Sequence, residues 1–156
     1  MKGCKKMNNP VLTSGILSWL AAQIIKTLLH AVKSDKLVLE RFVGAGGMPS
    51  SHTAMVLGTL ITTGRLEGTD SALFGVAFVF SAVVIYDAMN VRRAAGLHAM
   101  ELNAINKLFN FRNIKHDTED DEKKQKELNE FLGHTPLEVL GGAVVGTIVS
   151  LLIPIK

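Results

Sequence analysis

Two histidines, far apart in the 156-residue chain, each stand at the start of an apolar segment. His52 closes the sequence Pro-Ser-Ser-His at 49–52, which follows several glycines and precedes the uncharged run 53–63. His134 comes shortly before the uncharged run 139–153. Imidazole moves protons near neutral pH and can attack phosphorus, and the first turn of a helix offers free N–H groups to an anion. The two positions therefore predict a site for phosphate chemistry.

Other groups suited to phosphate lie near the same helix ends. Gly46 and Gly47 would let the backbone approach an anion, and Pro49 would occupy the first helical turn. Asp87 ends an apolar segment and is expected to pair with a cation. The groups expected to bind phosphate are the side chains of Lys33, Arg41, Arg92 and Arg93 and the backbone N–H groups near Ser50 and Ser51.

Each of these residues also has a purely structural interpretation. Glu138 lies three residues after Thr135, with Pro136 between them, and this spacing predicts a capping box. Either histidine could sit at a helix end beside water, and the paired arginines at 92–93 could anchor a membrane helix. The residue pattern leaves both interpretations open.

The composition, 47% hydrophobic and 20% charged, is apolar for a soluble protein of this length. The apolar residues are concentrated in segments that are apolar on all sides, which is typical of helices in lipid or fully enclosed in protein. Gly142 and Gly146 have the spacing of close helix packing in a membrane. We therefore expect an all-α fold, a single membrane domain over 1–156, rather than a soluble helical domain. The predicted transmembrane helices are 10–32, 49–64, 70–88 and 136–153.

A polar insertion, 92–133, separates the third and fourth predicted helices. Apolar residues from Leu97 to Phe109 recur at helical spacing, which predicts an amphipathic helix on the membrane surface or on the bundle. The following charged stretch is predicted to be a solvated helix starting near Thr118, in preference to a metal site around His116.

The distribution of charge predicts an orientation. More lysines and arginines fall in the loops 33–48 and 89–135 than on the other side, which places these loops, and both histidines, at the cytoplasmic face of what we expect to be the plasma membrane. The net charge is only +3, and no basic stripe with interleaved aromatic residues indicates nucleic-acid binding.

Three motifs, taken together, resemble a known family. The sequences GGMPSSH at 46–52, YDAMNVRRAAG at 86–96 and LGHTPLEVLGGAVVG at 132–146 resemble the divergent bacterial and plant branch of the type 2 phosphatidic acid phosphatases, which are related to vanadium-dependent haloperoxidases. The resemblance covers nearly the whole chain from about residue 8.

The resemblance implies a role for each matched residue. His134 would form a phosphohistidine, Glu138 would orient it, and His52 would protonate the leaving group. Arg92 or Arg93 would hold the phosphate, and no metal or other cofactor would be needed. The catalytic interpretation also predicts that the two histidine rings lie roughly 5–9 Å apart, because a phosphate between them would be held by hydrogen bonds of about 3 Å on each side.

The chain also departs from the family pattern. The family's first motif is a lysine, six residues and Arg-Pro, whereas here seven residues separate Lys33 from Arg41 and Phe42 replaces the proline. A glutamate replaces the usual aspartate, and two of the usual six helices are missing.

The predicted function is hydrolysis of a lipid phosphate or related phosphomonoester or diphosphate. The alternatives are a non-catalytic membrane protein that binds a phosphorylated lipid or anion, and a helical subunit of a membrane complex. The expected partners are a phosphate ester and membrane lipid, and the sequence leaves a homo-oligomer open.

Overall fold

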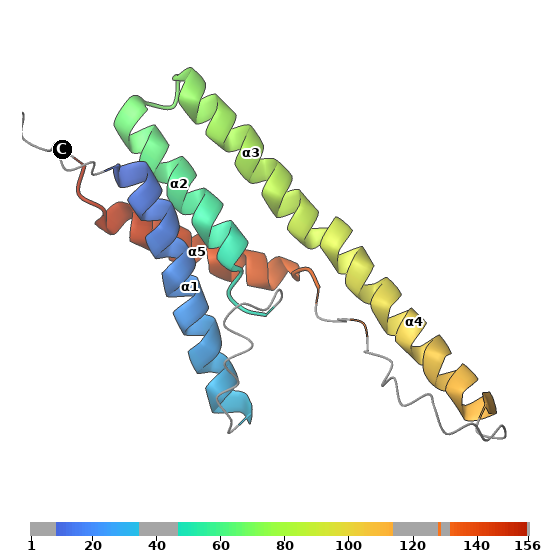
Figure 1. Cartoon of the computed structure of the whole chain (residues 1–156). Coiled ribbons are helices and arrows are strands. Elements are labelled where there is room, and N and C mark those ends of the chain that lie inside the picture. Colours follow the sequence, from blue (N-terminus) through green and yellow to red (C-terminus); the bar gives the residue numbers. More distant parts are fainter. Residues whose placement is uncertain (1–8, 35–46, 114–127, 129–131, 156) are drawn as a thin grey trace, which may run out of the picture.

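The computed structural model describes residues 9–34, 47–113, 128 and 132–155, and every regular element in those residues is a helix (Figure 1). The all-α prediction is confirmed. Each of the four predicted apolar helices begins and ends within three residues of the ends of an observed helix. The helices are α1 (Pro10–Ser34), α2 (Ser51–Glu67), α3 (Ala72–Met89), α4 (Val91–Asn113) and α5 (Pro136–Leu152).

Polar residues fix where the apolar helices begin. The Asn9 side chain accepts hydrogen bonds from the first turn of α1. Ser50, Ser71 and Thr135 each accept one from the backbone N–H three residues later. Such caps satisfy N–H groups that have no partner within the helix. Because Ser50 is the cap of α2, Pro49 lies before the helix, and its predicted place in the first helical turn is wrong.

Helix α2 is the centre of the bundle and contacts α1, α3 and α5 (Figure 1). Helices α1 and α3 run antiparallel to it. Helix α5 begins beside the start of α2, where the Ser50 N–H donates to the Glu138 carbonyl. It ends beside the end of α2, where Arg65 donates to the carbonyls of Ser150 and Ile153. The starts of α2 and α5 therefore share one end of the bundle.

Glycines let α5 approach α2 closely, as the sequence predicted. A Cβ atom on Gly142 would lie 2.3 Å from the Ser50 carbonyl oxygen, and one on Gly146 would lie 2.5 Å from that of Ala54. No side chain fits at such distances. The spacing of the two helices is therefore set by the absence of side chains at these two positions.

The bundle is polar inside and apolar outside. The largest fully buried side chains are serines and threonines, such as Ser14, whose hydroxyl donates to the Gly58 carbonyl across the α1–α2 contact. Large apolar side chains such as Leu73 and Phe80 are mostly exposed. An apolar outer surface of this kind is suited to lipid. The apolar runs predicted the helices, but they did not indicate which side chains face the inside of the bundle.

Two stretches of the described residues are long and apolar enough to cross a membrane, Pro10–Val32 and Ala72–Leu108, and Pro136–Leu152 is a shorter apolar helix. Helix α2, predicted as a span, does not meet the same test. Its position explains its composition, because a helix surrounded by other helices needs small residues for close packing more than large apolar ones.

Helix α4 confirms the predicted helix within the insertion. It follows almost directly from α3 and extends away from the bundle (Figure 1), and among the described helices it contacts only α3. It therefore does not lie on the bundle, and its placement on a membrane surface stays a prediction. The Asn103 side chain pairs with the backbone of Leu128. The predicted charged helix near Thr118, with His116, lies outside the described residues.

Candidate functional site

The two histidines meet at one end of the bundle, although 82 positions separate them in the sequence. His52 lies in the first turn of α2, and His134 lies in the segment just before α5. Their ring centroids are 6.2 Å apart, and the ring planes are inclined by 59°. This distance falls within the range of roughly 5–9 Å that is expected if a phosphate binds between the two rings.

Glu138 holds both His134 and the start of α5. Its Oε2 atom lies 3.0 Å from His134 Nδ1 and also accepts a hydrogen bond of 3.1 Å from the Thr135 N–H. The Thr135 side chain accepts in turn from the Glu138 N–H, so the predicted capping box is present. An ionised carboxylate can only accept, so His134 must carry a proton on Nδ1. The neutral ring then has its lone pair on Nε2, the form that a nucleophile requires.

Burial favours the same neutral form. The His134 side chain is only 3% exposed, and this burial lowers the pKa of its imidazole below the usual range. The hydrogen bond that His134 donates to Glu138 opposes that change, whereas the positive charge of Lys26 adds to it. Burial is the largest of these effects and keeps the pKa of His134 below its usual range, which favours the neutral imidazole at neutral pH.

A glycine gives His134 its position. Gly133 has φ of 83°, a backbone conformation that favours glycine, and a Cβ atom there would lie 2.4 Å from the Arg93 backbone nitrogen. The next residue, His134, donates its N–H to the Ala88 carbonyl at 2.9 Å. The segment before α5 is thereby fixed against the junction of α3 and α4.

Of the two candidate arginines, Arg92 lies beside His52. Its Nε donates to Asp87 Oδ2 at 2.7 Å, which confirms the expected cation partner of Asp87. Arg92 and Asp87 line a cavity of about 190 Å³ together with His52. Arg93 does not line this cavity, and it contributes its backbone to the support of Gly133.

Lys26 was not among the predicted site residues, because a lysine inside an apolar helix can either extend to the membrane surface or face the bundle. This lysine lies in α1 and is only 8% exposed, and its charge acts on Glu138, His134 and His52. Its aliphatic stem lies beside Gly47. The signal that could have identified it is that Lys26 is the only charge in the apolar run 11–32, since a charge inside a membrane helix usually marks a functional site.

The other predicted phosphate ligands are only partly placed by the structure. The Ser50 N–H is already used by the Glu138 carbonyl, so the N–H groups left to meet an anion at the start of α2 are those of Ser51 and His52. Lys33 lies in the last turn of α1 rather than in a loop, and Arg41 lies outside the described residues. Among the described residues, no three histidine, cysteine or acidic side chains group closely enough to hold a metal ion.

The motifs can now be compared with those of known proteins. The model of the divergent PAP2 family matches residues 7–149. The chain belongs to the divergent PAP2 family. One relative, described as the uncharacterized membrane protein YuiD of Bacillus subtilis (strain 168), is 36% identical over 154 residues, which cover 94% of this chain and 95% of that protein. No solved structure matches the chain. The divergent PAP2 match covers α1 to α4 and most of α5, and the chain is a membrane protein.

Proposed function

We propose that this divergent PAP2 protein hydrolyses a phosphorylated membrane lipid through a phosphohistidine on His134. The observation that supports this most directly is the pairing of His134 Nδ1 with Glu138 beside the His52 ring. A carboxylate that fixes the tautomer of a buried histidine leaves Nε2 as a nucleophile, and a second imidazole nearby can supply a proton.

The first step would transfer the phosphoryl group to the protein. His134 Nε2 forms a bond to phosphorus while the bond between phosphorus and the ester oxygen breaks. His52, when protonated, gives its proton to the departing oxygen. Arg92, Lys26 and the N–H groups of Ser51 and His52 would offset the charge of the phosphate oxygens, as cations and helix starts do in other phosphate sites.

The second step would release phosphate. Water attacks phosphorus, the bond to Nε2 breaks, and His52 takes a proton from the water as it reacts. Glu138 would stabilise the positive charge on the His134 ring while the phosphoryl group is attached. His52 would therefore give a proton in the first step and regain one in the second.

Phosphate release from a panel of lipid phosphates and lipid diphosphates tests the proposal directly. The purified protein in detergent should release phosphate from at least one of them, and His134→Ala should abolish both the release and any phosphohistidine trapped without acid. Normal release by His134→Ala would refute the role of His134 as nucleophile.

A non-catalytic lipid-binding role is the second candidate. The observation that favours it is the direct ion pair of Arg92 with Asp87, which already engages a cation that phosphate would need. In that case vesicles containing a phosphorylated lipid would bind the protein in a manner that depends on Arg92, and no substrate would be hydrolysed.

We also propose that the site faces the cytoplasm at the plasma membrane, because the loops on its side carry most of the lysines and arginines. Cys4 is the only cysteine, so its replacement by serine gives a background for single-cysteine labelling. A cysteine placed in 115–130 should then react with an impermeant reagent only after the cells are opened. Labelling of intact cells would reverse the orientation.

A further inference from the structure

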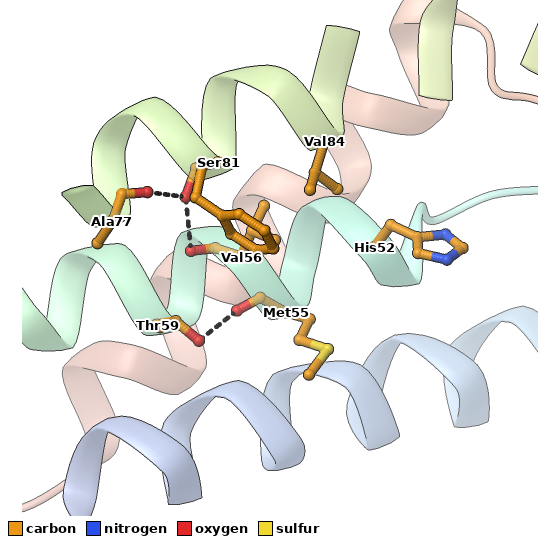
Figure 2. Close-up of a pocket in the computed structure, with 8 residues that line it drawn as sticks. His52, Met55, Val56, Thr59, Ala77, Ser81 and Val84 are labelled. Carbon is orange, nitrogen blue, oxygen red and sulfur yellow. Dashed lines mark hydrogen bonds between the residues drawn. The ribbon is translucent and has the colours of Figure 1, made fainter. Parts of the chain in front are cut away.

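A groove of about 350 Å³ runs between α2 and α3 and begins at the candidate site (Figure 2). At one end lie His52 of α2 and Val84 of α3, and both also line the polar cavity that holds Arg92. At the other end lie Thr59 and Ala77 (Figure 2). The groove and the polar cavity therefore adjoin each other at His52 and Val84.

The groove offers a ligand almost no hydrogen bonds. Its two hydroxyl groups are used within the protein: Thr59 donates to the Met55 carbonyl at 2.9 Å, and Ser81 Oγ lies 2.7 Å from the Ala77 carbonyl and 3.2 Å from that of Val56 (Figure 2). A polar ligand group placed there would lose its water without gaining a partner. The groove accordingly selects an apolar group.

The dimensions and direction of the groove fit one hydrocarbon chain. Thr59 lies seven positions after His52 and Val84 lies seven positions after Ala77, so each wall is about 10 Å long at about 1.5 Å per residue. The groove follows the helix axes away from the polar cavity, as a lipid chain runs from its head group into a bilayer. Phe80, which is 63% exposed, lies along its outer side.

We propose that this groove binds one hydrocarbon chain of the substrate, with the phosphate of the same molecule in the polar cavity beside His52 and Arg92. The inference rests on the proposed function for the reaction and for the lipid nature of the substrate, and adds where one hydrocarbon chain of that substrate binds. The chain places the ester bond between the two histidines.

Alkyl phosphates of increasing chain length, compared with a small aryl phosphate that has no chain, test the proposal. For the unaltered protein, kcat/KM should rise with chain length until the chain fills about 10 Å of groove and then level off. Each methylene buried from water is worth up to about fourfold, and less when the substrate starts from a micelle or bilayer.

Ala77→Phe should fill the end of the groove that lies away from His52. We expect it to lower kcat/KM for the long alkyl phosphates on the order of tenfold, since it excludes several methylenes, while hydrolysis of the aryl phosphate is unchanged. Ala82→Phe is the matched control, because Ala82 is an exposed residue of the same helix that does not line the groove. If Ala77→Phe fails to fold, Phe80→Ala, which removes part of the wall, should lower the long-chain value instead.

Photo-crosslinking with an alkyl phosphate that carries a photoreactive group at the end of its chain separates this inference from the proposed function. Labelling of α2 and α3 next to the groove, reduced by Ala77→Phe and not by Ala82→Phe, supports the chain site even if no phosphate is released. Equal effects of the two variants on turnover and labelling, or hydrolysis that does not depend on chain length, would overturn the chain site and leave the phosphatase proposal standing.

Discussion

Replacing Glu138 by glutamine separates the two roles that the structure gives this residue. Its Oε2 atom meets both the Thr135 N–H and His134 Nδ1. The Thr135 N–H needs an acceptor, so the glutamine should place its amide oxygen where Oε2 was, and that oxygen can still accept from His134. Glutamine is also acceptable at this position of a capping box. The variant therefore keeps both hydrogen bonds and loses only the negative charge.

The size of the effect follows from that loss. A hydrogen bond to a charged group contributes about 1.5–3 kcal/mol, and one between neutral groups about 0.5–1.5 kcal/mol. The difference of about 1–2 kcal/mol applies while the His134 ring is positively charged, and it corresponds to a decrease in turnover of roughly 5–30-fold. This is smaller than the 10²–10⁴-fold range typical of losing an acid–base or orienting group altogether, because the orienting contact survives.

The pH profile gives a second readout that a cap alone would not change. Glu138 raises the pKa of His134 against the effect of burial. Glutamine removes the charge, so the pKa should fall further and the acid limb of kcat/KM should move to lower pH. The assay is phosphate release as a function of pH, with thermal unfolding in detergent to confirm the fold.

Thr135→Ala is the matched control for the cap. It removes the N-cap hydroxyl, at a cost of about 1 kcal/mol in the free energy of unfolding, and leaves the charge of Glu138 in place. Unchanged turnover and an unchanged acid limb in Glu138→Gln would mean that Glu138 is only a cap. A loss of 10³-fold or more in the folded variant would mean that the amide presents its NH₂ group to His134 and forces the wrong tautomer.

Three further changes test the supports of the site. Gly133→Ala should destabilise the protein by about 2 kcal/mol or more, because the left-handed backbone costs about 1–2 kcal/mol and the new Cβ atom clashes with the Arg93 backbone. The unfolding temperature and turnover should both fall. Normal values of both would contradict the observed backbone conformation. Lys26→Met should weaken competitive inhibition by phosphate and move the acid limb of kcat/KM to higher pH, because its charge lowers the pKa of His134; a larger effect from Lys33→Met would return the phosphate-binding role to the residue predicted from the sequence. Arg65→Gln should lower the unfolding temperature and leave kcat/KM unchanged, since Arg65 binds carbonyls at the opposite end of the bundle; an altered kcat/KM would show that the two ends are coupled.

The sequence predicted the helices from their apolar runs, which are local signals, and it predicted that the two histidines share one end of the bundle because consecutive membrane helices alternate in direction. The choice between Arg92 and Arg93 could not be made in the same way. In a continuous helix, residues five apart such as Asp87 and Arg92 point about 140° away from each other. They pair here because the helix is interrupted at Asn90, between α3 and α4. The direction of a side chain beyond such an interruption is not encoded in residue spacing.

Lys26 could not be assigned to the site from the sequence for a different reason. A single charge in an apolar run has two outcomes, since a lysine can extend to the membrane surface or turn into the bundle. The neighbouring residues decide between them: the small side chains of α1 and α2 let the helices pack closely, and Lys26 is left on the enclosed side. The outcome depends on which face of α1 meets α2, which is a property of the packed bundle.

Packing of α2 against α5 also bears on the distance between His52 and His134. At Gly142 the helices are close enough for the glycine to lie against the Ser50 carbonyl. Gly142 is one turn beyond Glu138 on α5, and Ser50 is two residues before His52 on α2, so a larger residue at 142 would move both members of the site apart. The same pair of helices is joined by the Ser50 N–H bond to the Glu138 carbonyl, only 2.9 Å long. Gly142 therefore supports both the packing of α2 against α5 and the placement of the two histidines, so the fold and the proposed chemistry depend on the same contact.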